Sequence, residues 1–451
     1  MSKNSKIAML RDAPVGKALV YLALPAVLTS LVNTLHNLID TMYISQLHDN
    51  AMIAATTVAL PIATFAQAIG DGIGVGTSSF LGRLLGAKDE SRVESLIATS
   101  ITITCIVSLI FFLFSLTLLR PLIFIFTDDL AVVGHSYNYL IVLMTFSFFT
   151  ISKQVLSHML RAGGDVNYPM MVIVLSIALN VLLNPIFMFD YGFGLKVQGA
   201  AVATVIAEAF ASLALFHRIM FKDELLKWKP GKFMLNVPSI KEIVNVGIPV
   251  FVRSGLSSVS HGFFAKSAGL FGTDFLAASG IARKGEYFAR FVIMGVAQGY
   301  QPFAAYNYGA KNKQRLMSGM KLSMCFTVCY GLLMGSFFLF FPHVFMGWLT
   351  DDASLISLGK YILIGYAFAV PMVAVYQILA YNFQALGKGK LSFISAVLRQ
   401  GIVYCPLVIL LPRMFGVAGM YVVQPICDWS SALIALFLSR PIFKEVQSLD
   451  A

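Results

Sequence analysis

Long, nearly uninterrupted runs of apolar residues recur along the chain, separated by short polar segments rich in Gly, Lys and Asp. Each run is about 20 residues long or longer, which is the length that a helix needs to cross a hydrocarbon core of roughly 30 Å. They predict twelve membrane-spanning helices, over residues 18–46, 52–82, 94–118, 131–159, 168–188, 197–216, 243–271, 275–305, 317–342, 353–383, 391–412 and 415–439.

The second half of the chain repeats motifs of the first half at a nearly constant distance. The matched motifs are Leu24-Pro25 with Ile248-Pro249, Gly86-Ala87-Lys88 with Gly309-Ala310-Lys311, and Glu208 with Asp428, at offsets of 224, 223 and 220. Because six spans is an even number, both halves have one orientation, and a pseudo-two-fold axis along the membrane normal relates them. We expect an all-α membrane protein with an N-terminal six-helix lobe (1–216), a cytoplasmic linker (217–242) and a C-terminal six-helix lobe (243–451).

Composition agrees with the span pattern. Hydrophobic residues make up 58% of the chain and charged residues 12%, whereas roughly a quarter of the residues of soluble domains are charged. With the N-terminus in the cytoplasm, 22 Lys and Arg fall inside, 3 outside and 8 within spans. This positive-inside pattern predicts a membrane protein with both termini cytoplasmic. The net charge of +11 therefore reports topology, and we expect no nucleic-acid partner.

Several chemistries find no support in the sequence. The five cysteines all lie within predicted spans, where free thiols pack as small hydrophobes. No phosphate-binding loop of the GxxxxGK[ST] type occurs, which favours an ion gradient over ATP as the source of energy. The histidines form no constellation suited to an intramembrane acyltransferase, and an enzyme has no need of a six-plus-six repeat. We expect a transporter and not an enzyme.

Asp40 is the most informative polar residue within a span. Asn33, His36 or Asn37, and Asp40 recur at i, i+3 or i+4, and i+7, which places them on one helical face. A charge at this depth costs roughly 2.5–3.5 kcal/mol or more unless it is paired or hydrated, and such acids usually mark ion pathways. We expect Asp40 to exchange H⁺ or Na⁺; the alternative is a purely structural hydrogen bond to a neighbouring helix.

The fifth predicted span carries Asn180 and Asn184 one turn apart, followed by Pro185. Proline removes a backbone hydrogen bond and frees the carbonyl of residue 181, so that Pro185 is a candidate hinge. The asparagine oxygens could coordinate a cation, or the two amides could join helices. The spacing alone does not favour either interpretation.

The motifs of the first half together resemble one transporter family. They are Leu24-Pro25 through Asp40-Thr41, Gly74-Val75-Gly76-Thr77-Ser78-Ser79 with Arg83, Gly86-Ala87-Lys88, Arg161-Ala162-Gly163-Gly164, Leu179-Asn180 with Asn184-Pro185, and Gly199-Ala200-Ala201. Nearly the whole chain resembles the multidrug and toxic compound extrusion family, MATE, and most closely its bacterial, prokaryotic branch. The resemblance implies a twelve-helix, two-lobed antiporter of the bacterial plasma (inner) membrane, which exports amphipathic, often cationic compounds against an inward flow of Na⁺ or H⁺.

The resemblance also implies where the coupling cation binds. Its site in the N-terminal lobe would comprise Asp40, Tyr139, Asn180, Asn184 and Thr204. Some relatives have an acid at the position of Asn184, so this chain keeps one carboxylate with neutral oxygens, and the choice between H⁺ and Na⁺ stays open. Apart from Na⁺ at Asp40, we expect no metal and no cofactor.

The second half departs from the family pattern. Many members carry an acid in the seventh span, but the stretch from Arg253 to His261 has none. The spans of this half are instead basic, and Arg283, Glu286 and Arg290 share one helical face. Two interpretations are open. In the first, Glu286 neutralises part of this charge, and the remaining arginines form hydrogen bonds to carbonyl groups or extend toward the membrane surface. In the second, Arg283 and Arg399 line the cleft and favour zwitterionic or anionic compounds.

These considerations give a candidate substrate cleft. Its proposed residues are Asn33, His36, Asn37, Ser257, His261, Arg283, Glu286, Gln298, Tyr376 and Arg399. Expected partners are small-molecule drugs or metabolites, H⁺ or Na⁺, and the lipid bilayer, with one chain functional as a monomer. A flippase for lipid-linked oligosaccharide or other amphipathic anionic cargo is the alternative function, and a passive channel stays open as well.

Overall fold

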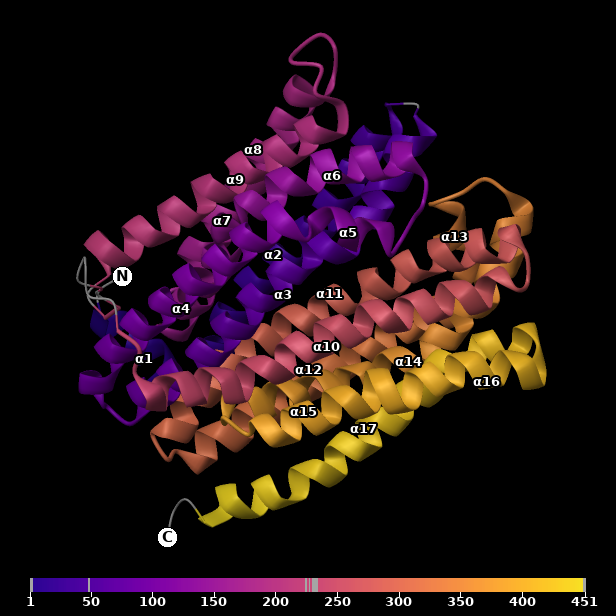
Figure 1. Ribbon diagram of the computed structural model, residues 1–451. Helices are drawn as coiled ribbons and strands as arrows, with labels where there is room; N and C mark the ends of the chain where they lie inside the picture. Colours follow the sequence, from indigo (N-terminus) through magenta and orange to yellow (C-terminus); the bar gives the residue numbers. More distant parts are fainter. Residues whose placement is uncertain (1–2, 48, 224, 227, 229–233, 449–451) are drawn as a thin grey trace. The chain divides into compact units, whose positions relative to one another are not determined.

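The computed structural model describes residues 3–47, 49–223, 225–226, 228 and 234–448, so the linker residues Lys227, Lys229 and Lys232 lie outside the described part. The described chain is helical throughout and contains no β-strand (Figure 1). In order, its elements are α1 (Lys3–Arg11), α2 (Val15–Ser45), α3 (Asn50–Gly86), α4 (Glu90–Thr117), α5 (Leu119–Phe124), α6 (Leu130–Thr145), α7 (Ser147–Ala162), α8 (Asn167–Met188), α9 (Lys196–His217), the π-helical turn η1 (Arg218–Lys222), α10 (Val237–Gly269), α11 (Thr273–Gly309), α12 (Lys313–Phe340), α13 (Pro342–Gly347), α14 (Ala353–Ala385), α15 (Gly389–Val397), the π-helical turn η2 (Leu398–Tyr404), α16 (Cys405–Phe415) and α17 (Val417–Gln447).

Each of the twelve predicted spans falls on a helix. Ten continuous helices among the described residues are long and apolar enough to cross a membrane. The predicted span over 131–159 is the pair α6 and α7, which meet at an angle of 50°. The predicted span over 275–305 lies on α11, which is 37 residues long and carries several charged residues. The span count from the sequence is therefore confirmed.

The repeated Gly-Ala-Lys motif ends a long helix in each half. Lys88 after α3 and Lys311 after α11 adopt left-handed backbone conformations, with φ of 59° and 55°. The next residues close the turn: Asp89 N donates to Leu84 O at 3.0 Å, and Asn312 N donates to Asn307 O at 2.8 Å. These 6→1 bonds satisfy carbonyls that a helix end leaves open.

The chain divides into two compact units, one of residues 1–11 and 31–247 and the other of residues 12–30 and 248–451. The beginning of α2 therefore packs in the second unit, and the beginning of α10 packs in the first. The lobe boundaries inferred from the sequence, at residues 216 and 243, stay a prediction.

Small residues allow these exchanged helix ends to approach closely. In the first unit, a Cβ on Gly76 of α3 would overlap the backbone of Ile243. In the second unit, a Cβ on Gly295 or Gly299 of α11 would overlap the backbone of α2. Gly-x-x-x-Gly spacing is typical of closely packed membrane helices, where it permits backbone contact.

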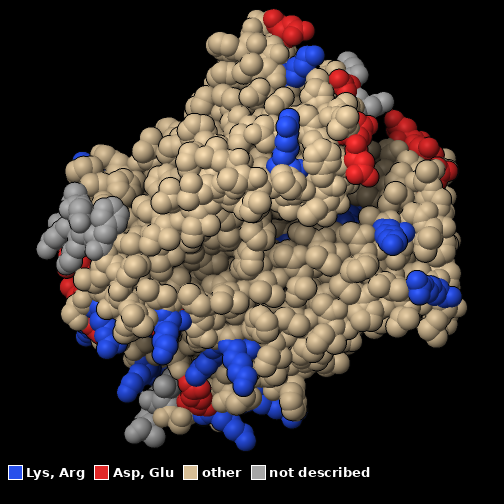
Figure 2. All heavy atoms as spheres, in the orientation of Figure 1, with Lys and Arg blue, Asp and Glu red and all other residues tan. Residues whose placement is uncertain are grey.

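Burial follows the positions of the helices within each unit. In the second unit, α14 is the most buried span, and it packs on α11, α12 and α17. Its apolar residues surround the whole helix, as expected for a core helix. Other helices keep large apolar side chains exposed, such as Leu182 at 66% and Phe437 at 64%. The face visible in Figure 2 is mostly uncharged, which suits contact with lipid.

Candidate functional site

A chain of hydrogen bonds joins α2, α8 and α9 in the first unit. Asn184 Nδ2 donates to Asp40 Oδ1 at 2.8 Å and to Asn180 Oδ1 at 3.0 Å. Asn180 Nδ2 in turn donates to Thr204 Oγ1 at 3.1 Å. The Thr204 hydroxyl donates to the Ala200 carbonyl at 2.9 Å. Four of the five residues expected at the cation site are thus connected from Asp40 to Thr204.

His36 belongs to the same cluster. Its Nε2 lies 2.8 Å from Asn180 Oδ1 and 3.3 Å from Asp40 Oδ2. The sequence analysis assigns His36 to the substrate cleft, whereas the structure places it beside Asp40, as the i, i+4 spacing of the two residues indicates. Asn33 and Asn37, from the same expected face, are exposed and do not join the cluster.

Asn184 presents a buried oxygen without a partner. The residue is 2% exposed, and within the described structure its Oδ1 accepts no hydrogen bond. A buried polar atom that is left unsatisfied costs about 1–3 kcal/mol. The amide nitrogen of the same side chain contacts Asp40. An acceptor oxygen beside an ionisable carboxylate can accept a hydrogen bond from the protonated carboxyl group or coordinate a cation.

Pro185 acts on the backbone as the sequence suggests. It lies within α8 and cannot donate to the carbonyl of Val181. That carbonyl instead accepts from Tyr43 Oη at 3.3 Å, and Tyr43 lies one turn beyond Asp40 on α2. The site helix α2 is therefore tied to the point in α8 where a backbone hydrogen bond is missing.

Tyr139, the fifth expected cation-site residue, lies on α6. It makes no hydrogen bond to the described cluster, but it is near enough to Asp40 and Glu208 for both carboxylates to act on it electrostatically. Glu208 of α9 binds Lys153 of α7 at 2.8 Å and accepts a hydrogen bond from Thr150. The ion pair between Lys153 and Glu208 was missed from the sequence, although the match of Glu208 with Asp428 marked the position.

A second membrane acid, Asp71 of α3, was also missed. Its Oδ1 accepts from Gln154 Nε2 at 2.9 Å and lies 3.4 Å from His158 Nε2. Gly74 allows the approach, because a Cβ there would overlap the His158 ring. An acid in the second predicted span was a signal in itself.

The basic residues of the second unit behave differently from one another. Arg399 of η2 donates from Nη2 to Asp428 Oδ1 at 2.7 Å, and both residues are buried. Its guanidinium stacks on Tyr376 at 5.0 Å. Arg290 binds Glu286 at 2.6 Å on α11. The charges of Arg399, Arg290, Glu286 and Asp428 are therefore balanced inside this unit.

The remaining expected cleft residues lie on α10 and α11. Ser257, His261, Arg283 and Gln298 are all half-buried. The Arg283 guanidinium stacks on the Phe264 ring at 4.4 Å, and neither Arg283 nor His261 has an ion-pair partner among the described residues. Arg283 thus differs from Arg290 and Arg399.

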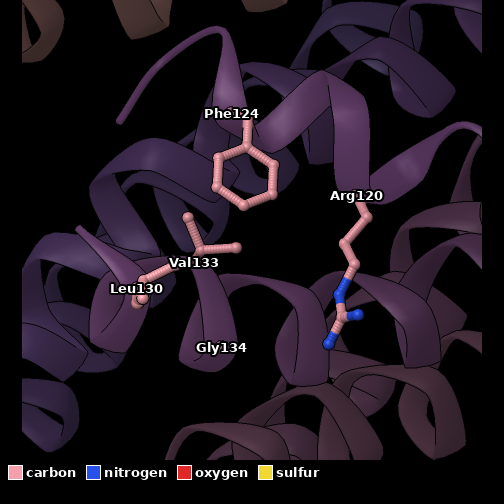
Figure 3. A pocket seen from close by; sticks show the side chains of 5 residues that line it. All are labelled: Arg120, Phe124, Leu130, Val133 and Gly134. Atoms are coloured by element: carbon pink, nitrogen blue, oxygen red, sulfur yellow. The ribbon is translucent and has the colours of Figure 1, made fainter. Parts of the chain in front are cut away.

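A cavity of about 340 Å³ lies between α5 and α6. Figure 3 shows the Phe124 ring beside Val133, with Arg120 on the other side of the opening from Leu130. The Arg120 guanidinium also stacks on Tyr137 at 5.3 Å. None of the residues expected at the cation site or the cleft lines this cavity.

A repeated set of membrane helices, with a cluster of one carboxylate and two amides within the first unit, is typical of a multi-pass membrane transporter. The MatE family model matches residues 25–186 and 249–410, which is most of both halves. The chain belongs to the MatE family. It is a transporter and not an enzyme.

Two relatives and two solved structures illustrate the similarity. The multidrug export protein MepA of Staphylococcus aureus (strain NCTC 8325 / PS 47) is 28% identical over 458 residues, covering 97% of each chain. MepA of Staphylococcus haemolyticus (strain JCSC1435) is 27% identical over 454 residues, covering 97% of this chain and 96% of the relative.

A transporter of the MOP superfamily from Pyrococcus furiosus superposes with a TM-score of 0.91 at 23% identity over 98% of both chains, and its structure is described as having a binding pocket of reverse polarity. An outward-facing multidrug resistance MATE transporter gives a TM-score of 0.89 at 24% identity over 98% of both chains. These matches confirm the predicted family and the all-α, two-lobed membrane fold.

Proposed function

We propose that this protein is a cation-coupled multidrug efflux antiporter of the bacterial plasma membrane, with both termini in the cytoplasm. It works by alternating access, as a monomer, and needs no cofactor beyond its coupling ion. The MepA relatives are named as multidrug exporters, which supports the substrate class. The observation that carries the coupling mechanism is the buried, unpartnered Oδ1 of Asn184 on the side chain whose nitrogen contacts Asp40.

The mechanism begins with Asp40 ionised, accepting from the Asn184 amide as observed. When a proton or cation from outside binds Asp40, the carboxyl group becomes a hydrogen-bond donor or carries a bound cation, and it no longer favours the N–H group of Asn184. The Asn184 amide then rotates about its last torsion and turns Oδ1 toward Asp40. Rotation about this sp³–sp² bond is broad and inexpensive. The buried oxygen gains a partner only in the loaded state, so the loaded state is stabilised by this contact.

The amide rotation has a route to the rest of α8. Turning the Asn184 amide also removes its hydrogen bond to Asn180 Oδ1. Pro185 follows directly, and α8 is held at Val181 only through Tyr43. A helix that lacks a backbone bond bends readily at that point. Loading of Asp40 therefore bends α8 around Pro185, helps to expel the substrate, and is followed by an inward reset.

The contacts favour H⁺ over Na⁺ as the coupling ion. Asn180 Oδ1 already accepts from Asn184 and contacts His36, so it has little capacity left for a metal ion. Na⁺ would need several free oxygens, whereas a proton needs only the carboxylate and one acceptor. His36 beside Asp40 adds a second group that can carry a proton.

Transport in proteoliposomes tests the proposal. Wild-type protein and Asp40→Asn are compared for movement of ethidium, a cationic dye, under imposed pH or Na⁺ gradients. We expect gradient-driven transport by the wild type and at least about a hundredfold loss in Asp40→Asn, because the variant cannot ionise. Asp128→Asn is the matched control, since Asp128 is an exposed acid in the loop before α6.

Equal coupled transport by wild type and Asp40→Asn would remove Asp40 from the mechanism. Movement of lipid or anionic cargo alone, indifferent to Asp40, would support the flippase alternative. Transport driven only by Na⁺ would keep the antiporter and overturn the choice of H⁺.

A further inference from the structure

Arg283 of α11, in the second unit, is an arginine within a membrane helix that forms no ion pair with any described residue. Among the residues that the structure describes, Arg283 makes neither an ion pair nor a hydrogen bond, and its contact is the stacking on Phe264 at 4.4 Å. Glu286, one turn along α11, is held by Arg290 at 2.6 Å. A charged side chain within a span is costly unless it is paired or hydrated. Arg283 is therefore a cation with no anion in direct contact, and Glu286, which acts on it electrostatically, is bound by Arg290 instead.

The contact with Phe264 leaves the N–H donors of the Arg283 guanidinium free to form hydrogen bonds. Arg283 Cζ lies over the Phe264 ring at 4.4 Å from its centroid, and the N–H donors of a guanidinium lie at the edge of its plane. Such an arrangement holds the guanidinium in one orientation without using any of its five donors. A carboxylate or phosphate can then bind through two parallel hydrogen bonds.

Other polar groups converge on the same place. Arg283 lies within electrostatic reach of the phenols of Tyr366 and Tyr404, and His261 lies within reach of Arg283. Tyr366 and Tyr404 are 4% and 6% exposed, and over the described chain neither phenol has a hydrogen bond. Buried Tyr hydroxyls usually have a partner. Arg283, His261, Tyr366 and Tyr404 thus share one region of the second unit, and Glu286, the carboxylate that also acts on this region, is held by Arg290.

We propose that Arg283, together with His261, Tyr366 and Tyr404, binds the carboxylate of transported amphipathic compounds. This inference rests on the proposed function as an exporter and narrows its substrates to those with an acidic group on an aromatic body. The guanidinium and the phenols supply the hydrogen bonds to the carboxylate, and Phe264 packs against the aromatic body of the ligand. Arg399 and Arg290 do not take part, because Asp428 and Glu286 occupy them.

A pair of dyes that differ only in this acidic group tests the inference. Tetramethylrhodamine carries a free carboxylate, and its methyl ester does not. Equilibrium binding of both dyes to purified protein in detergent is followed by fluorescence anisotropy, for wild type, Arg283→Gln and Lys284→Gln. Lys284 is the control, since it is an exposed cation next in sequence on the same helix.

We expect Arg283→Gln to weaken binding of the acid at least about tenfold, or about 1.4 kcal/mol, and to change binding of the ester less than about twofold. Lys284→Gln should change neither affinity. Arg283→Lys should lie between wild type and Arg283→Gln for the acid, because it keeps the charge and loses the bidentate geometry. It also serves if Arg283→Gln does not elute as a folded protein.

Failure of wild type to bind the acid, or an equal change for acid and ester in Arg283→Gln, would overturn the inference. A lipid phosphate offers the same chemistry as a substrate carboxylate. Displacement of the acid by phosphatidylglycerol, combined with no transport of the acid in liposomes, would assign the position to lipid and overturn its role in substrate binding. These measurements are independent of the ethidium assay on Asp40→Asn, so that failure of the antiporter proposal is seen separately.

Discussion

The two units carry an acid at repeat-related positions and neutralise it in different ways. In the first unit, Glu208 of α9 binds Lys153 of α7 at 2.8 Å; in the second, Asp428 of α17 binds Arg399 of η2 at 2.7 Å. At the offset of 223, the position of Lys153 is occupied by Tyr376, on which Arg399 stacks. The acid thus lies at the repeat-related position in both units, whereas its basic partner comes from different helices in the two units. The units therefore conserve charge balance and not a particular donor.

The same comparison at Asp40 shows an inversion of polarity. At the offset of 224, Asp40 corresponds to Phe264, the ring on which Arg283 stacks. The first unit thus presents a carboxylate among neutral amides, and the second presents a guanidinium over an aromatic ring. On our proposals, the repeat has separated two tasks, with the coupling ion bound in the first unit and an acidic group of the substrate bound in the second.

Breaking the buried ion pair of the second unit should have the largest effect on stability. Arg399→Met leaves Asp428 fully buried, at 0% exposed, with Gln424 as its remaining partner. Loss of one partner of a buried pair costs about 3–5 kcal/mol. We expect a clear fall in the midpoint of thermal unfolding of the purified protein in detergent.

Two further variants sharpen this comparison. Lys153→Met should be less harmful, because the Lys153 side chain is 17% exposed against 5% for Arg399 and Thr150 still contacts Glu208. The double variant Tyr376→Lys/Arg399→Ser places a lysine at the position in the second unit that corresponds to Lys153, and it removes the arginine that binds Asp428. The acid is then offered a lysine partner, as Glu208 is in the first unit. We expect the double variant to recover part of the loss seen in Arg399→Met. If Lys153→Met is the more destabilising single variant, burial does not set the size of the effect.

The sequence predicted the twelve spans and the proximity of Asp40 to His36 on one helical face because both depend on periodicity along single helices, whereas Asn33 and Asn37 of the same predicted face do not join the cluster. The i, i+4 spacing of Asn180 and Asn184 likewise survives in the observed hydrogen bonds. Partners on different helices could not be derived in this way. The pairing of Arg399 with Asp428 depends on the π-helical turn η2 and on packing against α17, neither of which has a signature in the spacing of residues.

The exchanged helix ends and the bend between α6 and α7 were equally beyond the sequence. Both preserve the apolar pattern that identifies a span, so the pattern does not distinguish a straight helix from a bent one. The close approach of α2 to Gly295 and Gly299 likewise depends on which helix packs against them, and that is a property of the folded chain.

Outside the membrane spans, another repeat-related pair also has opposite charge. Asp165, after Gly164, binds Lys6 at 2.8 Å and Arg218 at 2.9 Å. At the offset of 223 the second unit has Lys388, which binds Glu445 at 2.7 Å. The same turn is therefore anchored by a carboxylate in one unit and by an ammonium group in the other.

Acid should weaken the anchor of the first unit selectively. Burial by itself raises the pKa of Asp165, but hydrogen bonds from Lys6 and Arg218 outweigh it and hold that pKa below its ordinary value of 3.8. A carboxyl group whose pKa is lowered by folding stabilises the protein at pH values above its ordinary pKa. This stabilisation is lost as the pH falls through the lowered pKa. Burial alone would lower the pKa of Lys6, but Asp165 and Asp223 outweigh burial and raise that pKa above its ordinary value of 10.5. The contribution of Lys6 to stability is therefore lost only as the pH rises through the raised pKa.

Unfolding midpoints of wild type and Asp165→Asn measure this effect. We expect a difference of about 1–3 kcal/mol that is constant between about pH 5 and pH 9 and shrinks in stronger acid. Lys388→Met is the comparison in the second unit, and its effect should be smaller, since Lys388 and Glu445 are 29% and 40% exposed and exposed pairs contribute little. A difference for Asp165→Asn that grows on acidification would contradict the assigned direction.

The smallest effect concerns a feature that the two units share. Lys88 and Lys311 both adopt φ near 60°, at 59° and 55°, where an L-residue with a side chain is strained and glycine is not. Lys88→Gly and Lys311→Gly should each stabilise the protein by about 0.5–1 kcal/mol, because relief of strain exceeds the greater backbone entropy of glycine in the unfolded chain. Lys88→Ala is the control, since it removes the charge and keeps the strain. Equal gains in Lys88→Gly and Lys88→Ala would assign the effect to charge. Equal gains in the two glycine variants, with none in Lys88→Ala, would show that backbone geometry defines this turn in both units. The turn would then be shared by the two units although the charges at the Asp165 and Lys388 positions are opposite.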